Sequence, residues 1–159
     1  MDNELDALFR EHYNPLKLYI WSLCKNIHLA EDVACDAFYK ALKLPSFTDG
    51  NFKYWLYKTA RNRLIDLIRR KKFEGEMPEH SEPVSPENSP ENELIKNERY
   101  RALYHALDLL NEAQREVLML MYFQDMSIIE ISALTGKTEA NVKVLLHRGR
   151  EELKKLLNT

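Results

Sequence analysis

Apolar residues recur three and four positions apart along most of the chain, a spacing typical of amphipathic helices. No alternating run of Val, Ile and Thr indicates a strand, and only four glycines interrupt the pattern. The spacing therefore predicts an all-α protein whose helices cover residues 3–25, 29–43, 52–72, 94–110, 112–124, 128–135 and 139–157. Asn111, Ser127 and Thr138 stand where three of these helices begin, and their side chains can accept hydrogen bonds from first-turn amides.

Residues 74–93 break the helical spacing. This segment, EGEMPEHSEPVSPENSPENE, holds four of the six prolines and seven glutamates, but no Lys or Arg. Such a composition buries too little apolar surface to offset the entropy lost on ordering. The sequence therefore predicts two small helical domains, residues 1–73 and 94–159, joined by a flexible acidic linker. A solvated tether with no role of its own is the simpler interpretation of that linker.

The whole composition is that of a globular protein, with 159 residues of which 45% are hydrophobic and 30% charged. No apolar run approaches the roughly 20 residues that a membrane span requires. Asp2, Glu4 and Asp6 stand where a signal peptide is basic and then apolar. We therefore expect a cytoplasmic protein with no direct membrane insertion. In that reducing compartment Cys24 and Cys35 stay thiols, and each fits a small buried or half-buried helix position.

Nothing in the sequence has the pattern of a catalytic or metal site. The histidines have no tight ligand spacing with the cysteines, and neither a Gly-rich phosphate loop nor a Ser-His-Asp arrangement is indicated. We expect that the chain is not an enzyme and uses no metal and no cofactor.

The sharpest motif lies between Met126 and Arg150. A short helix, a turn at Gly136 where a positive φ costs little, and a longer helix make up a helix-turn-helix. Helical spacing turns one set of side chains inward: Ile128, Ile131, Leu134, Val142, Leu145, Leu146, Gly149 and Leu153. The opposite side of the longer helix carries Ala140, Lys143, His147 and Arg150. This basic face suits a recognition helix in the major groove of DNA. An ordinary amphipathic helical hairpin with a charged exterior is the alternative.

A second basic segment, residues 53–72, reads KYWLYKTARNRLIDLIRRKK and has eight Lys or Arg against one Asp. On a helix, the side chains predicted to form a buried stripe are Phe52, Leu56, Ala60, Leu64 and Leu67. Those predicted on the exposed side are Tyr54, Lys58, Arg61, Asn62 and Arg69. Basic groups beside an aromatic ring and an amide suit phosphates and unstacked bases. Against this, Trp55 and Tyr57 fit the core, and the final basic run can simply stabilise a helix C-terminus.

Four sequence blocks follow one another in the order LFREHYNPL, AEDVACDAFYKAL, FKYWLYKTARNRLIDLIRRKK and, after the acidic linker, LNEAQREVLMLMYFQDMSIIEISALTGKTEANVKVLLHRGREELKKLL. Together they strongly resemble a bacterial RNA polymerase sigma factor of the extracytoplasmic-function (ECF) type, over about residues 5–73 and 94–157. The resemblance implies a promoter-specificity subunit of RNA polymerase. Such a subunit binds the core enzyme, recognises the promoter elements near minus ten and minus thirty-five, and helps to melt DNA to start transcription.

The resemblance also implies which surfaces meet protein partners. Residues 1–73 correspond to sigma region 2, whose helix AEDVACDAF docks on the clamp helices of the polymerase β′ subunit. Residues 94–159 correspond to region 4, which meets the β flap. The implied docking residues are Asp32, Cys35 and Asp36; both carboxylates pair with basic groups of the partner, while Phe38 lies in the core. The family further implies an anti-sigma factor that clamps the two domains and hides both faces.

Promoter DNA contacts are implied in both domains. In region 2 a loop captures a base flipped out of the melted strand, and the DNA-facing residues are Ser46, Phe47, Thr48, Asp49, Asn51, Lys58, Arg61, Asn62 and Arg69. Asp66 lies on the same helix and either faces DNA or pairs with Arg69 or Arg70. In region 4 the implied upstream-element contacts, which include helix N-terminal amides, are Thr138, Asn141, Lys143, His147, Arg148 and Arg150.

The sequence departs from the family pattern at two places. Cys35 stands where the family usually has Gln, so one amide donor and acceptor is lost. Val144 and Leu145 follow Lys143 where the family often has Ser and Arg. Direct base reading is therefore expected to be either narrower or more dependent on Lys143 and His147.

The sequence is also compatible with two other functions. A stand-alone helix-turn-helix regulator would bind duplex DNA without entering polymerase, but it leaves the AEDVACDAF block and the basic helix unexplained. A protein-interaction adaptor would keep both helical domains and lose promoter recognition. Sequence-dependent initiation of transcription distinguishes all three functions.

Overall fold

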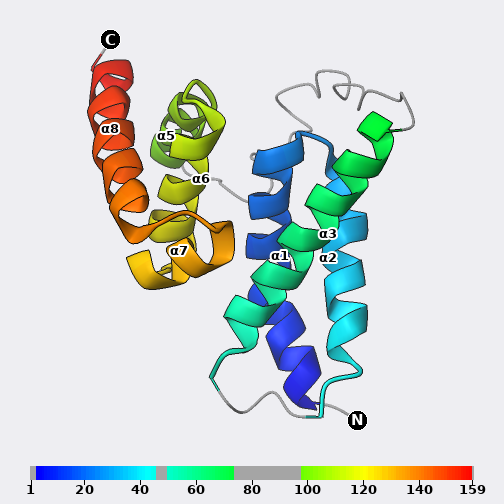
Figure 1. Ribbon diagram of the computed structural model, residues 1–159. Coiled ribbons are helices and arrows are strands. Elements are labelled where there is room, and N and C mark those ends of the chain that lie inside the picture. The colour runs from blue at the N-terminus through cyan, green and yellow to red at the C-terminus, as the bar shows by residue number, and fades with distance from the viewer. Residues whose placement is uncertain (1–2, 46–49, 74–97, 159) are drawn as a thin grey trace. The chain divides into compact units, whose positions relative to one another are not determined.

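The computed structural model describes residues 3–45, 50–73 and 98–158. All regular elements in these residues are helices, which confirms the predicted all-α class (Figure 1). The chain divides into two compact units, Met1–Pro83 and Val84–Thr159. The predicted linker, residues 74–93, lies outside the described residues. Among the described helices, none has the length and apolar character needed to cross a bilayer.

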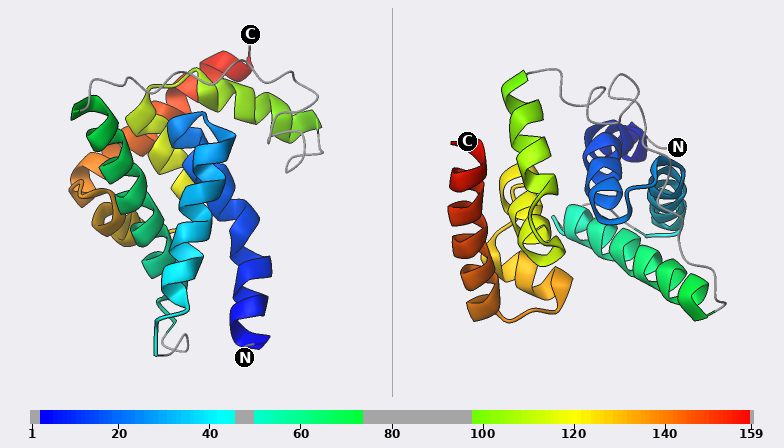
Figure 2. Two further views of the ribbon diagram at one scale, coloured as in Figure 1. Left: turned by 90° about the vertical axis from the view of Figure 1, so that its right-hand side faces the viewer. Right: turned by 90° about the horizontal axis from the view of Figure 1, so that it is seen from above.

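The first unit packs α1 (Asn3–Cys24), α2 (Ile27–Ala41) and α3 (Phe52–Phe73) against one another. Seen along α1 and α2, α3 lies across one side of the pair (Figure 2). Lys25 adopts a positive φ of 56°, which lets the chain turn between α1 and α2. The Asn26 side chain then accepts a hydrogen bond from the Leu29 amide at 3.1 Å. This cap brings the start of α2 forward from the predicted residue 29 to Ile27.

The core of the first unit combines large side chains of α1 and α3 with mostly small ones of α2. Its fully buried large residues are Leu16, Tyr19, Ile20, Leu56, Tyr57 and Leu64. On α2 the buried small residues are Ala30, Ala34, Ala37 and Ala41. The predicted buried stripe of α3 was wrong at Leu67, which is only half-buried because it lines an open groove between α2 and α3. Of the two aromatic residues assigned to the core, Tyr57 is buried and Trp55 is half-buried.

An aromatic contact anchors α2 to α1. Phe38 is 6% exposed, which confirms its predicted place in the core. Its ring meets that of Phe9 edge-on with centroids 4.9 Å apart, and Phe9 stacks on Tyr13 at 4.7 Å. Because Phe38 and the alanines face inward, the opposite side of α2 faces outward.

The second unit contains α5 (Glu98–Asp108), α6 (Glu112–Leu118), the π-helical turn η2 (Met119–Phe123), α7 (Ile128–Thr135) and α8 (Glu139–Leu157). The prediction of one α-helix over 112–124 was wrong in its second half. There the Gln124 amide donates to the Met119 carbonyl, five residues back, at 3.2 Å. A π turn of this kind holds one more residue than an α turn. Leu120 is buried as a result of this path, whereas Tyr122 is 55% exposed.

The predicted helix-turn-helix is confirmed in its local geometry. Ser127 and Glu130 form a capping box: the Ser127 hydroxyl accepts from the Glu130 amide at 3.1 Å, and the Glu130 carboxylate accepts from the Ser127 amide at 3.0 Å. Gly136 ends α7 with a φ of 77°, a conformation that costs glycine little. The Thr138 hydroxyl accepts from the Asn141 amide at 3.1 Å and begins α8.

Close packing at Gly149 holds α8 against α6. A Cβ atom at this position would lie 2.7 Å from Cδ1 of Leu118, whose side chain is buried. Glycine therefore lets the two helices pack more closely than any residue with a Cβ atom would. Val142 and Leu146 are buried on the same side of α8, as predicted, whereas Leu145 and Leu153 are half-buried at its margins.

Candidate nucleic-acid interface

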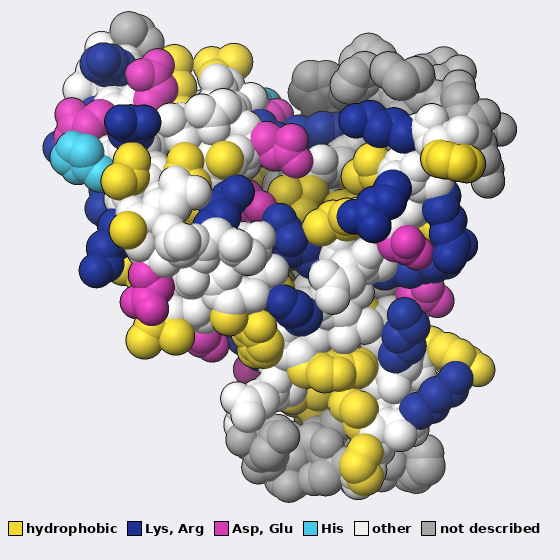
Figure 3. Space-filling model, in the orientation of Figure 1, with side chains coloured by type: hydrophobic (Ala, Val, Ile, Leu, Met, Phe, Trp, Pro, Cys, Tyr) yellow, Lys and Arg dark blue, Asp and Glu magenta, His cyan; other side chains and the backbone are white. Residues whose placement is uncertain are grey.

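A basic surface covers α3 in the first unit. Lys and Arg side chains gather over this helix in the space-filling view (Figure 3). Asn62 and Arg69 are exposed, as predicted, and Asn51, at the end of the loop implied to capture a base, is also exposed. Three further residues were also predicted to be exposed, but neighbouring side chains leave them half-buried: Tyr54, Lys58 and Arg61. The remaining residues of the predicted downstream-element set, Ser46, Phe47, Thr48 and Asp49, lie outside the described residues.

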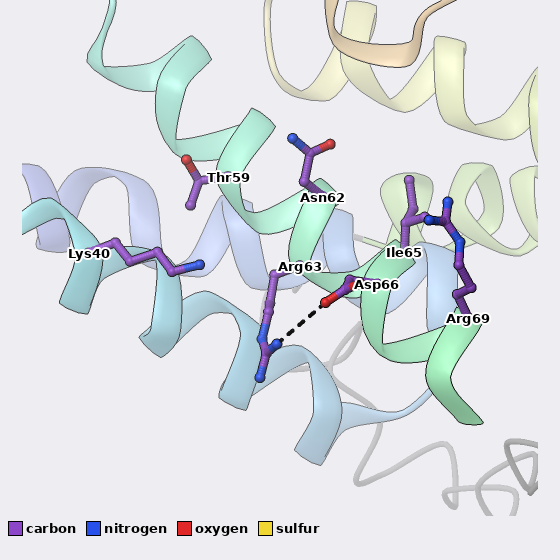
Figure 4. Close-up of a pocket in the computed structure, with 7 residues that line it drawn as sticks. All are labelled: Lys40, Thr59, Asn62, Arg63, Ile65, Asp66 and Arg69. Atoms are coloured by element: carbon purple, nitrogen blue, oxygen red, sulfur yellow. Dashed lines mark ion pairs between the residues drawn. The ribbon is translucent and has the colours of Figure 1, made fainter. Parts of the chain in front are cut away.

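A groove of about 520 Å³ runs along this basic surface between α2 and α3. Its lining side chains are Lys40, Thr59, Asn62, Arg63, Ile65, Asp66 and Arg69 (Figure 4). The groove brings Asn62 and Arg69 of the predicted set together with Lys40, which the sequence interpretation did not single out. Lys40 follows Asp36 by four positions on α2, so helical spacing alone places the two on one face.

Carboxylates of α2 and α3 form ion pairs with arginines of the basic surface. Arg63 Nε donates to Asp36 Oδ2 at 3.0 Å, and the Arg63 guanidinium also lies 3.8 Å from Asp66. Arg70 approaches Asp66 at 3.4 Å, which confirms one of the two intramolecular partners predicted for this carboxylate. These side chains are all partly exposed, so each pair contributes at most about 1 kcal/mol to stability. Their main effect is to hold Arg63 between the two helices.

A second groove, of about 660 Å³, brings together the three residues implied to dock on polymerase. Asp32 and Cys35 are exposed on α2, and Asp36 is half-buried at the α3 side of the groove. Its other lining residues are Leu29, Val33, Tyr39, Arg63 and Leu67. Asp36 is already paired with Arg63 within the chain. Asp32, in contrast, forms no ion pair with any residue that the structure describes.

The two cysteines differ in accessibility. Cys35 is exposed, which corrects the prediction of a buried or half-buried position, because it lines the open groove between α2 and α3 instead of the core. Its sulfur lies 3.9 Å from Tyr13 Oη, and burial together with this neighbour raises the pKa of Tyr13 to about 12. Cys24 is half-buried, and burial raises the pKa of its thiol. Cys35 is therefore the more accessible of the two thiols.

The second unit presents a basic face on α8. Ala140, Lys143, His147 and Arg150 are all exposed, which confirms the predicted outward side of this helix. The other residues of the predicted upstream-element set, Thr138, Asn141 and Arg148, are also exposed. Arg148 lies five residues from Lys143, roughly 140° round the helix. It lines a groove of about 570 Å³ that includes His147 and the turn between α5 and α6.

The helix N-terminus of α8 is partly engaged within the chain. Because the Asn141 amide donates to Thr138, this amide already has a partner at the position where the sequence interpretation placed a DNA contact. The guanidinium of Arg150 is engaged as well, through Tyr122 and Met121 of η2. No helical pattern in the sequence pointed to Tyr122, since its exposure depends on the π turn.

Models of known protein families match both halves of the chain. Sigma-70 region 2 matches residues 8–74, and sigma-70 region 4 matches residues 100–153. The ECF RNA polymerase sigma factor SigW of Bacillus subtilis is 34% identical over 155 residues, which cover 87% of this chain and 82% of that protein. SigM of the same organism, another ECF sigma factor, is 29% identical over 97% of this chain and 95% of its own length. The chain belongs to the family of ECF RNA polymerase sigma factors.

This sigma factor is a promoter-specificity subunit of RNA polymerase, as the sequence blocks implied. A solved sigma factor shares its fold: RpoE from Bartonella quintana, in complex with the anti-sigma factor NepR, is 24% identical. The TM-score is 0.76, and the similarity covers 99% of each chain. The α1–α3 unit thus contains region 2, and the helix-turn-helix unit contains region 4.

Proposed function

We propose that the two units divide promoter recognition between them. The first unit holds the core polymerase and the melted strand of the downstream element near minus ten. The second unit reads the duplex of the upstream element near minus thirty-five. The observation that carries this proposal is the pair of basic surfaces, one on α3 and one on α8, each on its own unit.

Two neighbouring grooves on α2 allow the first unit to meet both partners at once. Asp32 lines the second groove, which is the proposed contact with polymerase. Lys40 lines the groove that runs along the basic surface. The Asp32 carboxylate suits basic side chains of the β′ clamp helices. Lys40, Asn62 and Arg69 offer ammonium, amide and guanidinium donors to the phosphates and bases of an unstacked strand.

The exposed face of α8 suits the major groove. Asn141 and Lys143 lie in its first half, where a recognition helix contacts base edges. Lys143 and His147 follow one another at a spacing of four residues and therefore lie on the same side. We propose that these two side chains read bases and that the β flap of polymerase holds this unit, as the family resemblance implies.

The polymerase performs the chemistry of transcription, so this sigma factor needs no catalytic residue or cofactor of its own. It acts where the polymerase and the promoter are, in the cytoplasm. An anti-sigma factor that covers the docking face of α2 and the DNA faces of α3 and α8 would keep it inactive.

Run-off transcription with purified core polymerase tests the proposed function. A pooled library of promoter fragments serves as template, and transcripts are sequenced with and without this chain. We expect new transcripts whose templates share two sequence elements upstream of the start. Binding of duplex DNA without any transcript would support a stand-alone regulator instead. Transcripts that show no shared upstream sequence would contradict promoter recognition.

The exposure of Cys35 leads to a prediction for thiol chemistry. Alkylation with N-ethylmaleimide is expected to abolish binding to core polymerase, because it adds bulk in the centre of the proposed docking groove. Cys24 should react more slowly, since it is half-buried and burial raises its pKa, so less of it is thiolate. Mass spectrometry locates the modification, and native gel shift measures core binding.

The Cys35→Gln variant is the control for this experiment. It places at this position the amide that the family usually has, and its core binding should be the same before and after treatment. Full alkylation of Cys35 with unchanged core binding would remove Cys35 from the docking surface. Loss of binding by treated Cys35→Gln would assign the effect to Cys24.

A further inference from the structure

The side chain of Arg150 is held in place on the surface of the second unit. Its Nε donates to Tyr122 Oη at 2.6 Å, and its Nη2 lies 3.6 Å from the sulfur of Met121. The guanidinium carbon lies 5.5 Å from the centre of the Tyr122 ring, within cation–π range. Both Arg150 and Tyr122 are exposed, so this contact is accessible to a partner.

The π turn explains how Tyr122 reaches α8. Residues Met119–Phe123 form η2. Leu120 within this turn and Gln124 directly after it are buried, whereas Tyr122 is 55% exposed. A turn with one extra residue redirects the side chains that follow an α-helix, and such turns are frequent at functional sites. In this unit the result is an aromatic hydroxyl beside the last basic residue of the α8 face.

The hydrogen bonds between Arg150 and η2 leave neighbouring donors of Tyr122 and Arg150 available to a third group. A phenol has one O–H donor besides its acceptor lone pairs, and Arg150 Nε–H occupies a lone pair. The Tyr122 O–H can therefore donate to another group. A guanidinium has five N–H donors, of which Nε–H and one on Nη2 point to η2, so the others remain available. A neutral O–H next to a fixed cation with several N–H groups suits a phosphate oxygen.

The position of Arg150 along α8 fits the DNA backbone. It follows Lys143 by seven residues, or two turns, which is about 10.5 Å along the helix axis. The major groove of B-DNA is about 12 Å wide. When the first half of α8 contacts base edges, a side chain two turns further along reaches the edge of the groove, where the phosphates lie.

We propose that Tyr122 and Arg150 together clamp one backbone phosphate of the duplex upstream element. Tyr122 donates its hydroxyl hydrogen to the phosphate, and Arg150 binds the same phosphate instead of reading a base. The clamp sets the position of α8 in the groove and carries no sequence information itself. This inference rests on the proposed function of the second unit in binding duplex DNA.

The salt dependence of promoter binding tests the clamp. Wild type, Tyr122→Phe, Arg150→Gln and the double variant are assembled with core polymerase, and their affinity for a promoter obtained from the run-off library is measured at several KCl concentrations. Tyr122→Phe keeps the ring and removes only the hydroxyl, and we expect a loss of about fivefold, typical of one hydrogen bond. Arg150→Gln removes a phosphate contact and should reduce the slope of log affinity against log salt by about one.

The double variant and the templates separate a clamp from a structural role. Because the two groups act on one phosphate, the double variant should lose less than the product of the two single losses. Each loss should be the same on templates that differ only in upstream-element sequence. Lys154→Gln, an equal loss of charge in the last turn of α8, is the matched control and should leave the slope unchanged. Melting temperatures of all variants report any change in folding.

The outcomes distinguish this inference from the proposed function. Wild-type holoenzyme whose affinity does not depend on duplex upstream DNA would overturn the function of the second unit, and the clamp with it. Normal wild-type binding with an unaltered affinity of Tyr122→Phe would overturn the clamp alone. Losses that multiply in the double variant, or that change with the upstream sequence, would also overturn it.

Discussion

Replacement of Asp32 by Lys is expected to abolish transcription at every promoter that this sigma factor serves. Asp32 is exposed at the proposed docking groove and forms no ion pair with any residue that the structure describes. Its reversal therefore leaves the packing of α2 through Phe38 and the buried alanines intact. Like charges brought together at an interface cost several kcal/mol, so affinity for core polymerase should fall by about 100-fold. Native gel shift with purified core measures the affinity, and run-off transcription measures the consequence.

Glu4→Lys provides the matched control for this prediction. It makes the same charge change at an exposed position in the first turn of α1. Core binding and transcription by the control should stay close to wild type. Asp36 is less suitable for the test, because its replacement also breaks the pair with Arg63. Equal core affinity of Asp32→Lys and Glu4→Lys would show that this side of α2 does not dock on polymerase.

Lys143→Ala is expected to impair initiation chiefly at promoters with an intact upstream element. Lys143 is exposed on α8, and Val144 and Leu145 follow it without adding polar groups to the face. Much of the base reading therefore depends on Lys143 and His147. One good contact between a side chain and a base provides about 1–3 kcal/mol of discrimination, so transcript yield should fall by about tenfold or more. Run-off transcription on paired templates, with and without the upstream element, measures this effect.

Lys154→Ala, in the last turn of the same helix, is the control for Lys143→Ala. It removes an equal charge at a position away from the proposed base contacts and should leave both templates unaffected. An equal loss by Lys143→Ala on both templates would mean that Lys143 contributes to a sequence-independent step. Lys143 would then no longer be assigned to base recognition.

Features that depend on close sequence neighbours were predictable. The caps at Asn111, Ser127 and Thr138 were all identified from their residue types, and each binds an amide three residues ahead. The outward face of α8 followed from helical spacing, because α8 packs on one side only. The same reasoning was less accurate on α3, where Lys58 and Arg61 are half-buried by neighbouring side chains.

The π turn marks the limit of the spacing argument. Apolar residues continue through 112–124 at intervals of three and four, so the pattern predicts one continuous α-helix. The actual bond from the Gln124 amide to Met119 adds a residue to the turn. This change decides that Tyr122 lies at the surface, which no residue type within the segment indicated.

The sequence by itself determined the helical class, the helix starts at Asn111, Ser127 and Thr138, the two basic segments and the sigma factor family, because these follow from local hydrogen bonds, helical spacing and the order of the blocks. Only the tertiary structure decided that Cys35 is exposed, that Asp36 pairs with Arg63 and that Arg150 meets Tyr122. The last two contacts join residues 27 and 28 positions apart. Such contacts depend on how separate helices pack, and spacing within one helix cannot specify that packing.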